Sequence, residues 1–324
     1  MARNLLTLPS VDEDDYLVNL ADWVEATAIF SADRNASRED LKKALSRDGD
    51  SKDERAEQIA NDVFTELEDR AKACGESGKG KNNYPFSLDS TRTLLTLSAS
   101  PVTDDVIIYI FLLAITRGDM SSSTRKMAGV DPTKVFERMC ADVLLNFWGG
   151  QTAHSDSLIF GTARPKTKAG QVFPTNITNL CEKLKEGGGW KNGAQSAGAG
   201  DGKLDVAVWR RFSDERDGGL IGFAQCKTGV NWEDHLTKLN PESFSDTYFI
   251  SPLALHPVRV YMVPCRISAH KWRQKTKEGG LLMDRCRITQ YSHSIDATVK
   301  PDCRLWLDEA MKSQKQTMKK VTAG

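Results

Sequence analysis

The sequence predicts an α/β protein in which helices flank a mixed central sheet and a mostly helical domain precedes that sheet. Two observations carry the prediction. Up to about residue 125, apolar side chains recur at helical spacing between polar loops. From residue 126 on, short apolar strand-like runs alternate with helical segments, which is typical of a sheet flanked by helices. A chain of 324 residues can hold two domains, and we expect them at residues 1–125 and 126–324.

The first of these regions contains four helical segments. The first follows Ser10, and a second begins at residues 37–40, where an acidic residue stands three places after a serine that can cap the helix. Residues 51–73 have the clearest helical period, and residues 103–117 hold a long apolar run. Polar, glycine-rich residues 75–83 predict a loop.

The boundary between the regions is predicted at residues 117–131, which are rich in serine, glycine and charge. The segments after it are, in order, a helix starting at Asp131-Pro132, a strand at 157–163, a helix at 177–188, strands at 203–212 and 219–227, a strand at 258–264, a basic helix at 268–280, a strand at 281–289 and a final helix from Cys303. A polar turn joins the strands at 203–212 and 219–227, so they predict a hairpin.

Composition excludes several classes of protein. The longest apolar run, at 106–115, is too short to span a bilayer, and the N-terminus has no signal-peptide pattern, so we expect a cytoplasmic protein without membrane contact. The seven cysteines are scattered without a C-x-x-C pair, which argues against a disulfide framework and a zinc knuckle.

The formal net charge is zero, but the charges are unevenly distributed. Residues 1–73 carry eighteen Asp and Glu against ten Lys and Arg, whereas residues 257–288 carry eight Lys and Arg against two acidic residues. This asymmetry is compatible with a basic working surface beside an acidic domain, and equally with a solvated helix face.

A group of polar residues is predicted at the free end of the hairpin. Gln225 and Lys227 are two residues apart and so share one face of the second strand, while Cys226 points to the other face. Asp205 stands near the start of the first strand, far from the turn, so it lies near Gln225 and Lys227. The alternative is that Gln225 and Lys227 are only the polar end of a core strand that reaches solvent.

These residues suit a Mg²⁺ site, because Mg²⁺ prefers oxygen ligands and needs only one or two carboxylates besides waters and substrate oxygens. Asp205, the Gln225 side-chain oxygen and the Cys226 backbone carbonyl are the candidate ligands. Lys227 can hold an attacking water or stabilise charge that develops on a phosphoryl group. The pattern therefore predicts metal-assisted hydrolysis of phosphodiesters, with Mg²⁺ or Mn²⁺ as cofactor.

The sequences DGKLDVAV and GFAQCK resemble the PD-(D/E)xK nuclease superfamily, in particular the Mrr-like branch with a D…QxK motif. The resemblance covers about residues 131–290 and implies a restriction-endonuclease-like fold. It also implies that a glutamate on a helix before the sheet joins the metal site, and DPTKVFERMCADVLLNFWGG is similar to that helix, with Glu137 at the matching position. An exposed helical glutamate is the alternative for Glu137.

The resemblance implies a Mg-dependent DNA endonuclease with Asp205, Gln225, Lys227 and Glu137 as catalytic residues. We expect such a protein to act in bacterial antiviral defence or restriction, under the control of a partner protein, a ligand or a second copy bound through residues 1–125. The residues predicted to contact DNA are Lys203, beside the site, and His270, Lys271, Arg273 and Lys275 on the basic helix. Two alternatives stay open: a binding module that keeps the fold without catalysis, and a nuclease that acts on RNA.

Overall fold

The structure is a computed structural model that describes residues 5–13, 15–47, 53–77, 81–98, 103–104, 106–118, 120–121, 124–160, 173–194 and 202–322. None of the helices in these ranges combines the length and the apolar character needed to cross a bilayer. Residues 161–163 of the predicted strand at 157–163 and part of the glycine-rich segment before Asp205 lie outside the described residues.

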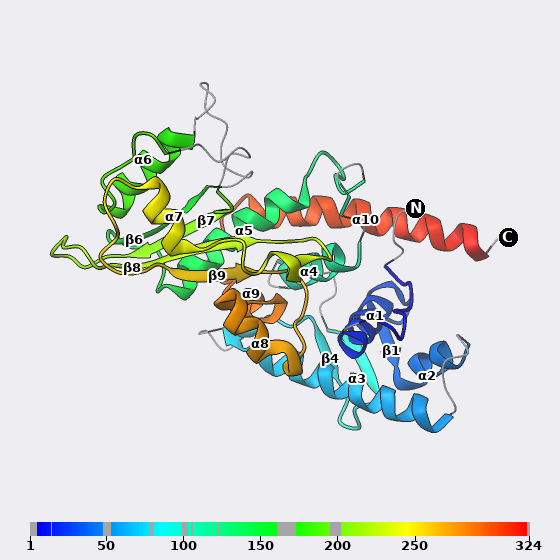
Figure 1. Cartoon of the computed structure of the whole chain (residues 1–324). Helices are drawn as coiled ribbons and strands as arrows, with labels where there is room; N and C mark the ends of the chain where they lie inside the picture. The colour runs from blue at the N-terminus through cyan, green and yellow to red at the C-terminus, as the bar shows by residue number, and fades with distance from the viewer. Residues whose placement is uncertain are drawn as a thin grey trace.

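A mixed five-stranded sheet forms the centre of the described part of the chain, in the order β10-β9-β8-β7-β6 (Figure 1). The strands are β6 (Ser155–Ile159), β7 (Val206–Arg210), β8 (Leu220–Cys226), β9 (Val258–Met262) and β10 (Leu281–Met283). β7 pairs antiparallel with both β6 and β8, so the predicted hairpin is confirmed. β8, β9 and β10 run parallel, which requires the chain to cross over the sheet between them.

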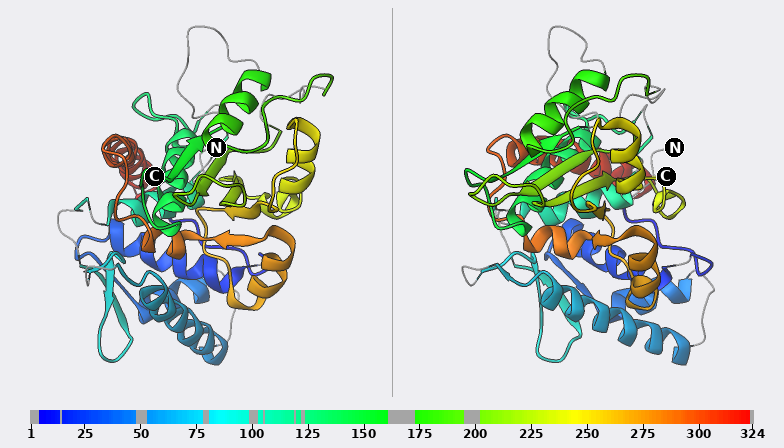
Figure 2. Two further views of the ribbon diagram at one scale, coloured as in Figure 1. Left: turned by 90° about the vertical axis from the view of Figure 1, so that its left-hand side faces the viewer. Right: turned by 60° about the vertical axis from the view of Figure 1, so that its left-hand side comes forward.

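Helices cover both faces of this sheet (Figures 1 and 2). On one face, α5 (Pro132–Phe147) packs on Val206, Val208 and Ala224 in one apolar cluster. On the other face, α6 (Phe173–Leu184) and α7 (Pro241–Tyr248) pack on alternate residues of the same strands, such as Ala207 and Phe223. Because successive strand residues point to opposite faces, the hairpin is buried on both sides. The α/β class is thus confirmed.

The N-terminal region is formed by α1 (Tyr16–Phe30), α2 (Arg38–Arg47), α3 (Asp53–Ala73) and α4 (Ile107–Arg117). It also contains strands that the sequence analysis missed: β1 (Asn35–Ser37), β4 (Phe86–Leu88) and β5 (Leu94–Leu97) form an antiparallel sheet, and β2 (Glu76–Ser77) pairs with β3 (Lys81–Asn82) inside the predicted loop. All are at most four residues long, too short for their alternation to be recognised in sequence.

The prediction of a strand at 281–289 is wrong beyond its first three residues. After β10, Asp284 accepts a hydrogen bond from the Arg287 backbone N–H at 3.1 Å and so caps α9 (Arg285–Gln290). The basic helix is found as α8 (Ala269–Gly279), and the C-terminal helix as α10 (Val299–Thr322). α10 packs on both α4 and α5, so the end of the chain lies against both halves of the molecule (Figure 1).

Two features join the regions on either side of residue 125. The largest apolar cluster takes side chains from both of them, from Leu20 to Ala310. A buried charge network crosses the same junction: Arg285 donates to the two Asp22 oxygens at 2.7 and 2.8 Å, and Arg70 donates to Asp22 at 2.7 Å and to Glu25 at 2.9 Å. Two tyrosine hydroxyls donate to the other Glu25 oxygen. The N-terminal helices therefore pack directly against the α9 segment of the sheet region.

Candidate active site

Asp205 lies at the open end of the β7–β8 hairpin and makes two hydrogen bonds to the backbone of β8. Its backbone N–H donates to the Ala224 carbonyl at 2.9 Å, and its carboxylate Oδ2 accepts the Cys226 backbone N–H at 2.8 Å. The regular antiparallel register pairs Val206 with Ala224, so the hydrogen bond from Asp205 to Ala224 is shifted by one residue from that register. The next N–H of β8, that of Cys226, is bonded by the Asp205 side chain and not by a backbone carbonyl. Asp205 is 7% exposed, and its carboxylate is held by the backbone of β8.

Glu137 and Asp205 lie around the same pair of thiols. Cys140, one turn after Glu137 on α5, contacts Cys226 at the end of β8. That contact and burial raise the pKa of Cys226 well above its usual range, and the charges of Asp205 and Glu137 add to the rise. Glu137 is only 8% exposed, so it is not a solvated helical glutamate. The charges of both carboxylates that the sequence analysis selected therefore act on the same buried thiol.

Gln225 lies on the other face of the strand. Ala224 and Cys226 face α5, whereas Phe223 faces α6 and α7, so alternation puts Gln225 with Phe223. Its side chain is 1% exposed, and neither its Oε1 nor its Nε2 has a hydrogen-bond partner among the described residues. A buried amide of this kind costs on the order of 1–3 kcal/mol unless a water or ligand satisfies it. The pairing of β8 with β9 places Tyr261 beside it.

Lys227 is the first residue after β8. Its backbone N–H donates to the Met262 carbonyl at 3.0 Å, which extends the parallel pairing by one residue and fixes where the side chain begins. The segment after it forms a 3₁₀ helix, η1 (Trp232–His235), that Tyr261 holds by donating its hydroxyl to the Trp232 carbonyl at 2.7 Å. Burial lowers the pKa of His235, and the charges of Lys238, Lys227 and Lys203 lower it further.

His235 and Lys238 are thus neighbours of Lys203 and Lys227, and the sequence analysis missed both. A pattern in the sequence could have indicated them. Trp232, Leu236 and Leu239 are apolar at a spacing typical of helical turns, which leaves positions 235 and 238 facing solvent in the segment that follows the strand. We call Lys203, Lys227, His235 and Lys238 the strand-end cluster.

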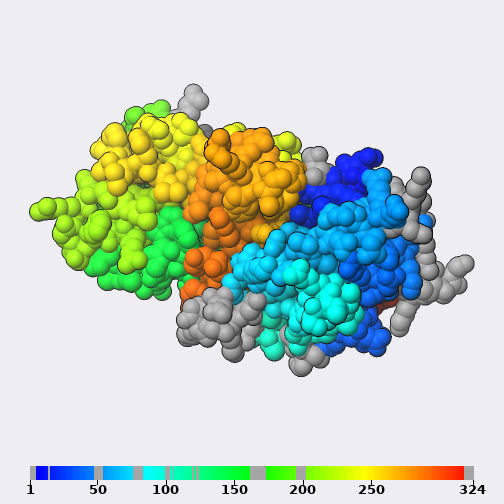
Figure 3. All heavy atoms as spheres, turned by 90° about the horizontal axis from the view of Figure 1, so that it is seen from below, coloured from blue at the N-terminus to red at the C-terminus, as the bar shows by residue number. Residues whose placement is uncertain are grey.

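The basic helix α8 has a different environment. Lys271 pairs with Asp15 at 3.2 Å and with Glu233 at 3.4 Å, and Lys275 pairs with Glu233 at 2.6 Å. In Figure 3 the orange α8 segment abuts the blue N-terminal segment, in agreement with these contacts. His270 and Arg273 are exposed. Two of the four α8 residues predicted to contact DNA are therefore engaged by acidic side chains, and the contact with DNA stays a prediction.

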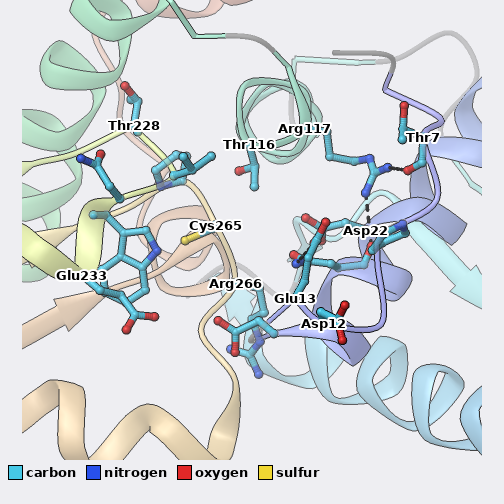
Figure 4. A pocket seen from close by; sticks show the side chains of 18 of the residues that line it. Thr7, Asp12, Glu13, Asp22, Thr116, Arg117, Thr228, Glu233, Cys265 and Arg266 are labelled. Carbon is cyan, nitrogen blue, oxygen red and sulfur yellow. Dashed lines mark hydrogen bonds between the residues drawn. The ribbon is translucent and has the colours of Figure 1, made fainter.

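A cavity of about 650 Å³ lies between the N-terminal segment and the chain that follows Lys227 (Figure 4). Its charged lining consists of six carboxylates and two guanidinium groups: Asp12, Glu13, Asp15, Asp22, Glu233, Asp234, Arg117 and Arg266. None of the four predicted catalytic residues lines it. A cavity with this excess of negative charge repels phosphate, so it is not the candidate active site.

The donors near Asp205 suit a hard divalent cation. The described residues contain no group of three or more His, Cys, Asp or Glu side chains that could hold a metal ion, so a protein-only cage is absent there. Two carboxylates, Asp205 and Glu137, remain, and Mg²⁺ is commonly bound by one or two carboxylates together with waters and substrate oxygens. The unsatisfied Gln225 amide adds a buried polar group that requires a partner. The set fits Mg²⁺ or Mn²⁺ and does not fit a structural zinc ion.

No protein-family model, curated protein or solved structure matches the chain.

Proposed function

We propose that this protein is a Mg²⁺-dependent nuclease that hydrolyses DNA phosphodiesters, with a restriction-endonuclease-like fold and a D…QxK site of the Mrr-like type. One observation carries the proposal: Asp205 is held at the hairpin end by the Cys226 N–H, and Lys227 directly follows Cys226 at the same strand end. The buried Glu137 on α5 supports it, because its charge and that of Asp205 both act on Cys226. A divalent cation that carboxylates hold, with a lysine close by, can assist the hydrolysis of a phosphodiester.

Each residue has a chemical role in this proposal. Asp205 and Glu137 would hold the cation, together with the Cys226 carbonyl at the end of β8, and Gln225 would join them directly or through a water. A divalent ion held there would supply Lewis-acid chemistry, polarising a phosphoryl oxygen and lowering the pKa of a water. Lys227 orients the attacking water and donates to the negative charge that grows on the phosphoryl oxygens.

The setting that we propose is bacterial defence or restriction, with activity controlled by a partner protein, a ligand or a second copy. The charges at the junction support such control of activity. The acidic cavity lies between residues 1–125 and the sheet, and Asp15 and Glu233 form ion pairs with the lysines of α8. DNA that approaches from this side meets repulsion, so a molecule that neutralises or displaces these carboxylates would increase DNA binding.

The test uses the full-length protein with supercoiled plasmid and Mg²⁺ or Mn²⁺, beside an EDTA control. We expect nicking or linearisation by the wild type, and loss of cleavage in Lys227→Ala. Lys183→Ala, an exposed lysine on α6 at the other end of the sheet, is the matched control and should cut like the wild type. RNA cleavage without DNA cleavage would indicate the RNA nuclease, and metal-independent DNA binding without cleavage of either would indicate the binding module.

A further inference from the structure

Like charges gather at the strand-end cluster. Lys203 lies two residues before Asp205, whose carboxylate accepts the Cys226 N–H at 2.8 Å, and Lys227 directly follows Cys226, so both lysines lie at the same end of the hairpin. The charges of Lys238, Lys227 and Lys203 lower the pKa of His235, after the larger effect of burial, while the charge of Asp234 raises it. In the part of the chain that the structure describes, no ion pair involves Lys227 or Lys238. Cations held near one another repel, and the arrangement becomes favourable when an anion binds among them.

The backbone holds these side chains in fixed places. Lys203 has a φ of 71°, a left-handed conformation that is uncommon for a residue other than glycine, and it follows Gly202, also left-handed at 56°. A Cβ on Gly202 would lie 2.7 Å from the Phe244 ring, so this turn packs tightly against α7. Strained backbone directly before Asp205 is typical of a functional site.

The other half of the cluster is equally fixed. Leu236 and Leu239 are 1% exposed and anchor the segment on either side of Lys238. The Lys238 N–H donates to the His235 carbonyl at 3.1 Å, which closes a turn and brings both side chains to one side of it. The backbone that carries the cluster is therefore held in place without a ligand.

We propose that Lys203, His235 and Lys238, around the catalytic Lys227, bind the phosphate backbone of the DNA on the side of the site opposite Glu137, and that α8 does not supply this contact. The inference rests on the proposed nuclease function, since it names the surface that presents the scissile phosphate to that site. Phosphate contacts fix the position of a nucleic acid without reading its bases. We therefore infer binding that depends little on sequence and strongly on salt.

The experiment measures binding by fluorescence anisotropy with a labelled 20-base-pair DNA duplex in EDTA, so that nothing is cut. We expect the double variant His235→Ala/Lys238→Ala to weaken binding about tenfold and to reduce the slope of log affinity against log salt by about one. The rival surface is tested with Arg273→Ala/Lys277→Ala, two exposed residues of α8, which should change affinity less than about twofold. Lys183→Ala is the charge-matched control.

The inference is overturned if the α8 variant weakens binding more than the cluster variant, if neither changes it, or if the wild type binds no duplex. Urea unfolding of each variant identifies any loss that comes from misfolding. The plasmid assay separates this inference from the proposed function. Cleavage with unchanged binding in the cluster variant would remove the inference alone. Cluster-dependent binding without cleavage by the wild type would remove the function and leave the binding surface.

Discussion

Two regions of this molecule bury polar groups, and they satisfy them differently. At the junction network, Asp22 and Glu25 accept hydrogen bonds from Arg70 and Asp22 accepts two from Arg285, so opposite charges lie together. At the hairpin end, Gln225 is as deeply buried as the network residues, yet neither of its polar atoms has a hydrogen-bond partner among the residues that the structure describes.

The difference separates structural from functional burial. A closed network repays part of the cost of removing charge from water and fixes how its helices pack. A buried amide that nothing satisfies lowers stability and persists where it serves another purpose. Changes in the junction network should therefore alter stability, whereas changes at the hairpin end should alter activity first.

The largest effect is expected for Arg285→Met. Removing one partner leaves the Asp22 charge buried beside a single guanidinium, which should lower the free energy of unfolding by about 3–5 kcal/mol in urea titrations. The matched control is Arg304→Met, whose ion pair with Asp104 is largely exposed and should contribute less than about 1 kcal/mol. Equal losses in the two variants would contradict the distinction between the regions.

Asp205→Asn should act in the opposite sense. The asparagine carbonyl can still accept the Cys226 N–H, so we expect the free energy of unfolding to stay within about 1 kcal/mol of the wild type. Loss of the negative charge should reduce cleavage at least about 100-fold in the plasmid assay. Asp246→Asn, on the exposed side of α7, is the control. Wild-type cleavage by Asp205→Asn would exclude Asp205 from the metal site.

Gln225→Met tests the unsatisfied amide directly. Methionine is similar in size and has no strong polar atoms, so the free energy of unfolding of the variant should be about 1 kcal/mol higher than that of the wild type. We expect its cleavage of DNA to be slower. Urea midpoints and initial cleavage rates measure the two effects. Destabilisation instead would mean that bound water or protein groups satisfy Gln225 in solution.

The smallest effect concerns the start of the helix that carries Glu137. Asp131 accepts a hydrogen bond from the Thr133 N–H at 3.1 Å and pairs with Arg125 at 3.0 Å. Burial raises the pKa of Asp131, but these partners outweigh it, and the pKa lies below its usual range. Asp131→Ala should cost about 1 kcal/mol at pH 7.

That stabilisation depends on pH in a defined direction. Because the folded pKa of Asp131 is depressed, its contribution is present above the unfolded pKa of about 3.9 and is lost as the pH falls through the folded value. Urea titrations at pH 7 and pH 3 should therefore show the wild type and Asp131→Ala converging in acid. Asp308→Ala, exposed on α10, is the control.

Local sequence patterns predicted the hairpin and the placement of Asp205 near Cys226, because a polar turn and strand alternation act over few residues. Glu137 near that site was implied by the family resemblance. The same patterns failed at residues 285–289, where basic and apolar residues alternate as in a strand but the Asp284 cap starts a helix. Nor could they show that Gln225 and Glu137 lie on opposite faces, since that depends on which face of the sheet α5 covers.

The basic helix illustrates a further limit. Lys271 and Lys275 are four residues apart and share a helix face, which is the pattern of a phosphate-binding surface. The structure places Asp15 and Glu233 against that face, from segments 256 and 38 residues away from Lys271. Charge spacing along one helix cannot reveal a partner that arrives from elsewhere in the chain.

The junction network also affects how the chain can be synthesised and divided. Asp22 and Arg285 are 263 residues apart, so a ribosome releases the carboxylate long before its second guanidinium exists. Until then, the Asp22 carboxylate on α1 lacks one of the two arginines that compensate its charge when it is buried. Closing a loop of this length also slows the completion of the core. A fragment that stops near residue 125 would lack Arg285 permanently, and we expect it to expose the α1–α3 surface and aggregate.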